Sequence, residues 1–130
     1  MRKLLPILLS ALMITGCAGT SNSQTNTYRS ITMDEAVDMM AQETSYIILD
    51  VRRADEFAAG HIPGAINVAN ESIGTAEILE LPDKDQLIMV YCRSGRRSKE
   101  ASEKLVKLGY TNIVEFGGIL DWKGEIVTGE

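Results

Sequence analysis

The 130-residue sequence contains few of the residues that build metal sites and disulfide frameworks, with one histidine and two cysteines. No group of histidine, cysteine and carboxylate residues shows metal-ligand spacing, so we expect neither a metal nor another cofactor. Long hydrophobic runs are also lacking, since the apolar run from Leu4 to Ile14 is too short to span a bilayer. Positive charge is scarce, and the net charge of −5 argues against a nucleic-acid partner.

The N-terminal segment is typical of an export signal. Arg2 and Lys3 form a basic region ahead of the apolar run, as in secretory signal peptides. The segment 14–17, Ile-Thr-Gly-Cys, resembles the lipobox of bacterial lipoproteins. This resemblance implies that Cys17 carries a lipid and that the protein is anchored to a membrane on the periplasmic or another extracytoplasmic face. An ordinary secretory signal with an incidental cysteine is the alternative.

The chain divides into a signal peptide (1–16), a lipidated cysteine with its tether (17–27) and one domain (28–130). Residues 18–27 are small, polar and uncharged, which predicts a flexible tether. The domain shows no internal repeat, and we expect a monomer. With lipid on the Cys17 sulfur, Cys92 is the one free thiol and no internal disulfide can form.

Helix-like and strand-like segments alternate along the domain. The patterns predict helices at about 32–41, 54–59, 72–81, 98–108 and 119–123, and strands at about 46–49, 65–68, 87–91 and 112–116. The first helix opens on a capping box formed by Thr32 and Glu35. This alternation predicts an α/β domain around a mostly parallel sheet, in which ligands bind beyond the carboxyl ends of the strands. Asp50 and Cys92 directly follow two of the predicted strands.

The segment 92–98, Cys-Arg-Ser-Gly-Arg-Arg-Ser, combines a thiol with three arginines between a strand and a helix. The amides of such a loop and the helix N-terminus favour negative charge. The arginines add to this field, so the pattern favours the thiolate form of Cys92 and predicts a nucleophile that acts on a small anionic ligand. A buried cysteine at the end of a strand, without chemistry, is the alternative.

Three groups of residues resemble the motifs of rhodanese domains, in order, between about Tyr28 and Val127. They are Leu49-Asp50-Val51-Arg52 with Glu56-Phe57 and the segment 60–67 (Gly-His-Ile-Pro-Gly-Ala-Ile-Asn), the loop 92–98, and Gly117-Gly118-Ile119 with Trp122. The resemblance implies a rhodanese-like fold, with a central, mostly parallel sheet of about five strands and helices on both faces.

The resemblance also implies sulfurtransferase chemistry with Cys92 as the catalytic residue. Cys92 would take a sulfur from a small anionic donor such as thiosulfate, carry it as a persulfide and pass it to cyanide or a thiol. The rest of the loop would bind the substrate, through amides that stabilise the persulfide and arginines that hold the sulfonate. These substrate-binding residues are Arg93, Ser94, Gly95, Arg96, Arg97 and Ser98.

Other residues near these motifs are given structural roles. Ser98 is expected to cap the helix that follows the loop. Arg52 and Glu56, four residues apart, are expected to form a surface ion pair. His61 lies in a Gly-His-Ile-Pro-Gly turn, which favours a conformational role over that of a general base. Asp50 is expected to be structural.

Two other functions use a similar loop. Cysteine-dependent phosphatases and arsenate reductases typically place an arginine six positions after the cysteine, whereas Arg97 stands five positions after Cys92. This spacing favours sulfur transfer. A persulfide carrier, or a binding module without fast turnover, needs the same loop, so the sequence leaves that alternative open.

Overall fold

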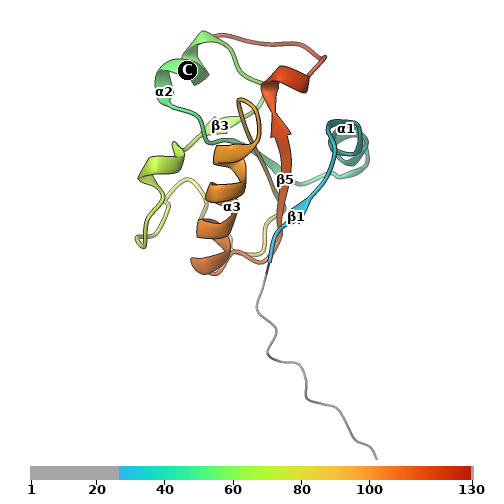
Figure 1. The fold of residues 1–130 in the computed structure, drawn as a ribbon. Coiled ribbons are helices and arrows are strands. Elements are labelled where there is room, and N and C mark those ends of the chain that lie inside the picture. The colour runs from blue at the N-terminus through green and yellow to red at the C-terminus, as the bar shows by residue number, and fades with distance from the viewer. Residues whose placement is uncertain (1–26, 130) are drawn as a thin grey trace, which may run out of the picture.

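A five-stranded sheet in the order β1-β5-β4-β2-β3 lies at the centre of the structure, and every pair of neighbouring strands is parallel (Figure 1). The computed structural model describes residues 27–129. The strands are β1 (Arg29–Ser30), β2 (Ile47–Asp50), β3 (Ile66–Asn67), β4 (Ile88–Cys92) and β5 (Ile113–Gly118). The helices are α1 (Met33–Gln42), α2 (Ala54–Ala59) and α3 (Arg96–Lys107), with short 3-10 helices η1 (Asn70–Ser72) and η2 (Ile119–Asp121). The predicted α/β architecture with a parallel sheet is confirmed.

Helices cover both faces of the sheet, as predicted. In β4, Ile88, Val90 and Cys92 pack in the hydrophobic cluster that includes side chains of α3. The alternate residues Met89 and Tyr91 pack in a second cluster, which includes side chains of α1 and α2. Side chains alternate between the two faces of a strand, so a strand covered on both faces reads as an unbroken apolar run. Figure 1 shows α1 and α3 on opposite sides of β5.

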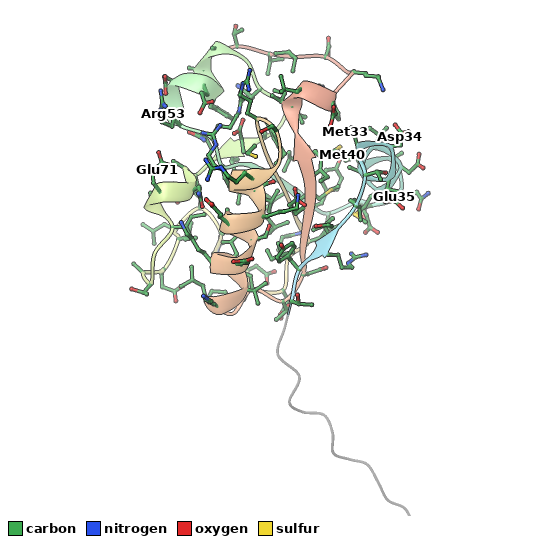
Figure 2. All side chains as sticks on the ribbon, in the orientation of Figure 1. Met33, Asp34, Glu35, Met40, Arg53 and Glu71 are labelled. Carbon is green, nitrogen blue, oxygen red and sulfur yellow. The ribbon has the colours of Figure 1, made fainter. Side chains whose placement is uncertain are left out.

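Helix α1 begins at the predicted capping box. The amide of Glu35 donates to Thr32 Oγ1 at 3.1 Å, and the amide of Thr32 donates to Glu35 Oε1 at 2.8 Å. Met33 and Met40 lie on the side of the helix that faces the sheet, and Asp34 lies on the outer side (Figure 2). This helix is therefore amphipathic and packs against the sheet through its apolar side.

The predicted helix at 72–81 is wrong. Within this range only Ser72, the last residue of η1, is helical, and the chain then continues as an irregular loop. Ile73, Ile78 and Leu81 are buried in the cluster beside α3, although their backbone is not helical. Gly74 disfavours a helix at this point, and tertiary packing of the apolar side chains decides the path of the loop.

Two helices and the first strand also differ from expectation. The predicted helix at 119–123 is reduced to the single turn η2, and α3 begins at Arg96 rather than at residue 98. Strand β1 was not predicted; its two exposed residues pair with β5. Exposed strands lack the apolar pattern on which strand prediction depends.

The N-terminal predictions fall largely on residues that the structure does not describe. The signal peptide (1–16), the lipidated Cys17 and the tether up to residue 26 lie outside the described residues. None of the helices between residues 27 and 129 has the length and hydrophobicity that a bilayer crossing requires.

Candidate active site

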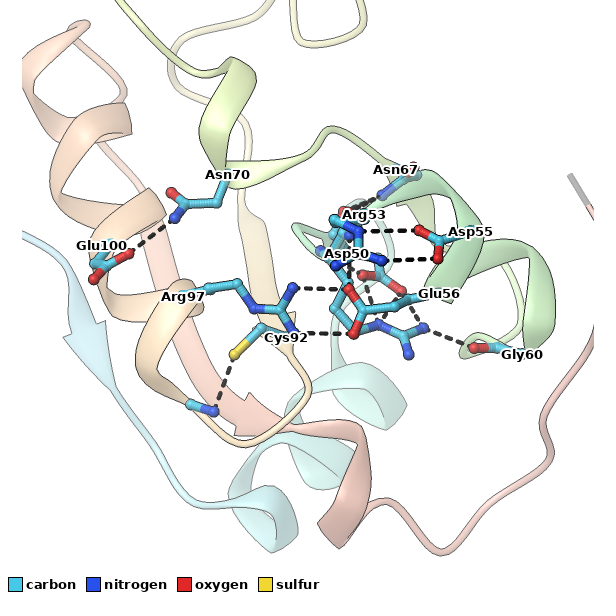
Figure 3. Close-up of polar contacts among 12 residues, drawn as sticks. Asp50, Arg53, Asp55, Glu56, Gly60, Asn67, Asn70, Cys92, Arg97 and Glu100 are labelled. Carbon is cyan, nitrogen blue, oxygen red and sulfur yellow. Dashed lines mark hydrogen bonds and ion pairs between the residues drawn. The ribbon is translucent and has the colours of Figure 1, made fainter.

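Cys92 is the last residue of β4 and lies at the carboxyl end of the sheet. The side chain is 1% exposed, and its Sγ accepts a hydrogen bond of 3.0 Å from the backbone amide of Gly95 (Figure 3). Gly95 has a φ of 119° and is the N-cap residue of α3. Glycine adopts this left-handed conformation without steric cost, so it allows the chain to turn and aim its amide back at the sulfur.

A pair of glycines at the end of β5, Gly117 and Gly118, supports this loop. A Cβ on Gly118 would overlap the carbonyl group of Arg93, so only glycine allows the two backbones to approach so closely. The amide of Leu120 donates to the same carbonyl oxygen at 3.2 Å. The Gly-Gly motif at the end of β5 therefore has a direct role beneath the loop that carries Cys92.

The three arginines of the loop have different environments. Arg97 is about four-fifths buried and binds Glu56 through two hydrogen bonds, of 2.8 and 3.1 Å. Arg96 is exposed and pairs with Glu100 at 2.9 Å. Arg93 is exposed, and among residues 27–129 it has no ion-pair partner. Of the three loop arginines, Arg93, the neighbour of Cys92, is thus the one whose charge is not paired with a carboxylate of the described residues.

The Glu56–Arg97 pair replaces the predicted pair between Arg52 and Glu56, which is wrong. Helix α2 begins at Ala54, so residue 52 precedes it and helical i,i+4 spacing does not apply. Arg97 donates hydrogen bonds to the Glu56 carboxylate and lowers its pKa to about 2, aided by the amide of Arg53. The same hydrogen bond and the negative charge of Glu56 raise the pKa of Arg97.

Asp50 and Arg52 form a separate, buried pair beside the site. The Arg52 guanidinium donates to Asp50 Oδ2 at 2.7 Å and to the carbonyl oxygen of Gly60 at 2.7 Å. The side-chain amide of Asn67 donates to the backbone carbonyls of both residues. These contacts join the end of β2 to α2 and β3, which agrees with the structural role expected for Asp50.

His61 is buried and engaged in packing. Its ring stacks on Phe57 at a centroid distance of 3.6 Å, and Nδ1 lies 2.8 Å from the carbonyl oxygen of Phe57. Its backbone pairs with Val127. The conformational role predicted for this histidine agrees with these contacts.

Ser98 does not cap α3, so that prediction is wrong. The helix begins two residues earlier, with Gly95 as its N-cap, and Ser98 is a fully buried residue of the first turn. Its hydroxyl lies 2.6 Å from Glu115 Oε2 and 3.0 Å from the carbonyl oxygen of Gly95. Sequence reasoning missed Glu115, although a carboxylate within an apolar strand is a signal, because buried charge requires partners.

The fold brings the predicted site together as one loop. The loop 92–98 encloses the thiol, with Arg93, Ser94 and Arg96 exposed and Gly95 and Ser98 buried. The part of the chain that the structure describes shows no cluster of three or more His, Cys, Asp or Glu side chains able to hold a metal ion. The role of the individual loop residues in binding a substrate stays a prediction.

The structure is an α/β domain with a parallel sheet, and its candidate nucleophile lies in the loop between the end of β4 and the N-terminus of α3. This is the arrangement expected from the sequence. The chain belongs to the rhodanese-like family, because the model of the Rhodanese-like domain matches residues 32–125. Similar proteins are named a thiosulfate sulfurtransferase and a putative sulfurtransferase, so sulfur transfer is supported at the level of the family.

Three similar proteins illustrate the relationship. The chain is 36% identical over 73 residues to thiosulfate sulfurtransferase PspE of Escherichia coli (strain K12), covering 56% of this chain and 70% of that protein. A rhodanese with anions from E. coli has a TM-score of 0.60 and 33% identity, covering 65% of this chain and all of that one. A rhodanese-like domain protein from Staphylococcus aureus has a TM-score of 0.67 and 29% identity, covering 78% and 99% of the two chains.

Proposed function

We propose that the protein is a sulfurtransferase that carries a sulfane sulfur on Cys92. The observation that carries the proposal is the 3.0 Å hydrogen bond from the amide of Gly95 to Sγ, in a loop that opens the N-terminus of α3. An amide aimed at sulfur stabilises a negative charge on that atom, in the thiolate and during transfer. The similarity to a thiosulfate sulfurtransferase supports the same chemistry.

The first half-reaction forms a persulfide. The Cys92 thiolate attacks the outer sulfur of thiosulfate, the S–S bond of the donor breaks, and sulfite leaves with the bonding electron pair. In the second half-reaction, cyanide or an acceptor thiolate attacks the outer sulfur of the persulfide, and the Cys92 thiolate is the leaving group. Charge and atoms balance in both steps, and no oxidant or cofactor is consumed. A covalent intermediate divides the transfer into two easier steps.

The three loop arginines differ in how accessible they are to an anionic sulfur donor. Arg93 is exposed beside the thiol and has no ion pair among the described residues, so we propose it as the main contact for the sulfonate group. Arg96 and Ser94 are exposed nearby, and Arg97 is held by Glu56. Gly95 and Ser98 contribute backbone and loop geometry rather than exposed side chains.

We also propose that the protein works as a monomer attached to a membrane by a lipid on Cys17, with the domain on the extracytoplasmic side. The motif at residues 14–17 and the polar segment that follows support this proposal. Fractionation of cells that express the full chain tests it. Cys17→Ala is expected to move the protein from the membrane to the soluble fraction, and continued membrane association would contradict the lipid anchor.

Turnover with thiosulfate and cyanide tests the proposed activity and separates an enzyme from a carrier. Thiocyanate production that is abolished in Cys92→Ser supports the enzyme. A persulfide that forms on Cys92 but is passed on slowly to cyanide and small thiols would instead favour the carrier, whose acceptor is another protein thiol. Transfer that survives in Cys92→Ser would contradict the proposal.

A further inference from the structure

Glu115 in β5 is a buried carboxylate that takes no part in the proposed half-reactions. It is 1% exposed, and a buried carboxylate is unfavourable unless hydrogen bonds replace its water. Its oxygens accept from the hydroxyl of Ser98 (2.6 Å), the amide of Gly117 (2.7 Å) and the hydroxyl of Ser30 (2.9 Å). Lys99, which is half-exposed, forms a longer ion pair at 3.8 Å. Neutral donors therefore do most to stabilise this charge.

Two of these hydrogen bonds lead directly to the loop around Cys92. The Ser98 hydroxyl also contacts the carbonyl oxygen of Gly95, the residue whose amide donates to Sγ. Gly117 has a φ of 93° and precedes the glycine that packs against the loop backbone. Glu115 Oε2 accepts both bonds, so one oxygen atom joins the start of α3 to the glycine turn that supports the loop.

We propose that Glu115 is a positioning residue for the Cys92 nucleophile. Through Ser98 and Gly117 it fixes the loop in the geometry that places the Gly95 amide against Sγ. For sulfur transfer this inference rests on the proposed function, but the position and reactivity of the thiol can be measured without it. Glu115 is fully enclosed, so it acts through its neighbours and does not touch the substrate.

The third hydrogen bond of Glu115 provides a matched control. Ser30 binds Oε1 of the same carboxylate but lies in β1, at the edge of the sheet. Ser30→Ala and Ser98→Ala each remove one hydroxyl from Glu115, and only the second hydroxyl leads to the active-site loop. If Glu115 only stabilised the fold, the two variants would change reactivity in proportion to their loss of stability.

The experiment compares the rate of Cys92 alkylation by iodoacetamide with the rate of persulfide formation from thiosulfate, in the purified protein. Ser98→Ala is expected to slow both reactions about tenfold or more, because a displaced nucleophile reacts poorly with any electrophile. Ser30→Ala is expected to stay within about twofold of the parent protein, as for other substitutions near the surface. Urea unfolding of each variant provides the stability correction.

Two substitutions of Glu115 itself complete the test. Gln can present its carbonyl oxygen to Ser98 and Gly117 and its amide to Ser30, whereas Leu can do neither. Glu115→Gln is therefore expected to restore most of the reactivity that Glu115→Leu loses. Equal effects of the two serine variants, or slowing with thiosulfate alone, would overturn the inference. Absence of a persulfide in the parent protein would contradict the proposed function, while the alkylation rates would still decide the role of Glu115.

Discussion

Two buried carboxylates lie on either side of Cys92 in the sheet, and their partners differ. Asp50 ends β2 and Glu115 belongs to β5, the two strands that flank β4. Asp50 binds the guanidinium of Arg52, a full positive charge, at 2.7 Å. Glu115 accepts mainly from hydroxyl and amide groups, two of which lead to the active-site loop. The two carboxylates are similarly buried but have different roles. Asp50 stabilises the fold, and Glu115 holds the loop that positions the thiol.

The largest effect on stability is expected from Asp50→Ala. This change leaves the guanidinium of Arg52 buried without its charge partner, which typically costs about 3–5 kcal/mol of unfolding free energy. Asp55→Ala is a matched control, because Asp55 forms the same kind of pair with Arg53 on the surface. Exposed ion pairs contribute little to stability, so we expect a much smaller loss for Asp55→Ala than for Asp50→Ala. Urea unfolding measures both, and equal losses would contradict the structural role of the buried pair.

Gly118→Ala tests the other side of Cys92. The new Cβ would overlap the carbonyl of Arg93, so the loop must shift, at a cost of about 1–3 kcal/mol. Cys92 alkylation is expected to slow as well, even after correction for stability. Gly74→Ala is the control, because Gly74 has open space for a Cβ and no positive φ. A Gly118→Ala variant that alkylates at the parental rate would contradict the support that β5 gives to the loop.

Glu56→Gln tests the ion pair that links α2 to the loop through Arg97. The folded-state pKa of Glu56 is about 2, below the ordinary value of 4.5, so the charged pair stabilises the fold fully above pH 4.5. That contribution is lost as the pH falls from 4.5 towards 2. At neutral pH we expect Glu56→Gln to cost about 1–2 kcal/mol of unfolding free energy, since the pair is partly exposed to solvent.

Urea unfolding of Glu56→Gln and the parent protein across this pH range measures the effect. The difference between the two proteins should shrink towards zero as the pH falls through the window. A difference that stays constant between pH 4.5 and 2 would show that the charge on Glu56 contributes nothing to stability.

The smallest effect is expected from Ser102→Ala, one helical turn after Ser98. Both serines are fully buried in α3, but within the described residues the Ser102 hydroxyl has no hydrogen-bond partner. Its removal is expected to leave stability unchanged or to raise it by up to about 1 kcal/mol. Thermal unfolding provides the measurement. A clear loss of stability would indicate that this hydroxyl has a partner, and the contrast with Ser98 would disappear.

Local patterns in the sequence predicted most of the fold. The capping box at Thr32 marked the start of α1, and the apolar run at 87–91 marked β4 because the strand is buried on both faces. The loop 92–98 could be identified as a candidate site because its cysteine, glycine and arginines are consecutive in the sequence, so no knowledge of the fold is needed to group them. The helix predicted at 72–81 was wrong. Apolar side chains of this segment are buried although the backbone is irregular, and tertiary packing decides the path of the chain.

The parts of the site that could not be predicted from the sequence depend on contacts between residues that are far apart along the chain. Arg97 and Glu56 are 41 positions apart, and nothing in their local sequences indicates the pair. Ser98 and Glu115 meet only when α3 packs on β5. Such partners are set by the register of the sheet and the placement of the helix, which periodicity does not encode. The carboxylate of Glu115 was nevertheless a usable signal, because charge within an apolar strand demands an explanation.

The intact mass of the purified protein after incubation with thiosulfate shows whether Cys92 accepts a sulfur atom. The parent protein is expected to gain the mass of one sulfur atom, and Cys92→Ser is expected to gain none. Subsequent cyanide should remove the added sulfur and restore the original mass. No gain in the parent protein, or the same gain in Cys92→Ser, would contradict sulfur transfer from thiosulfate through Cys92.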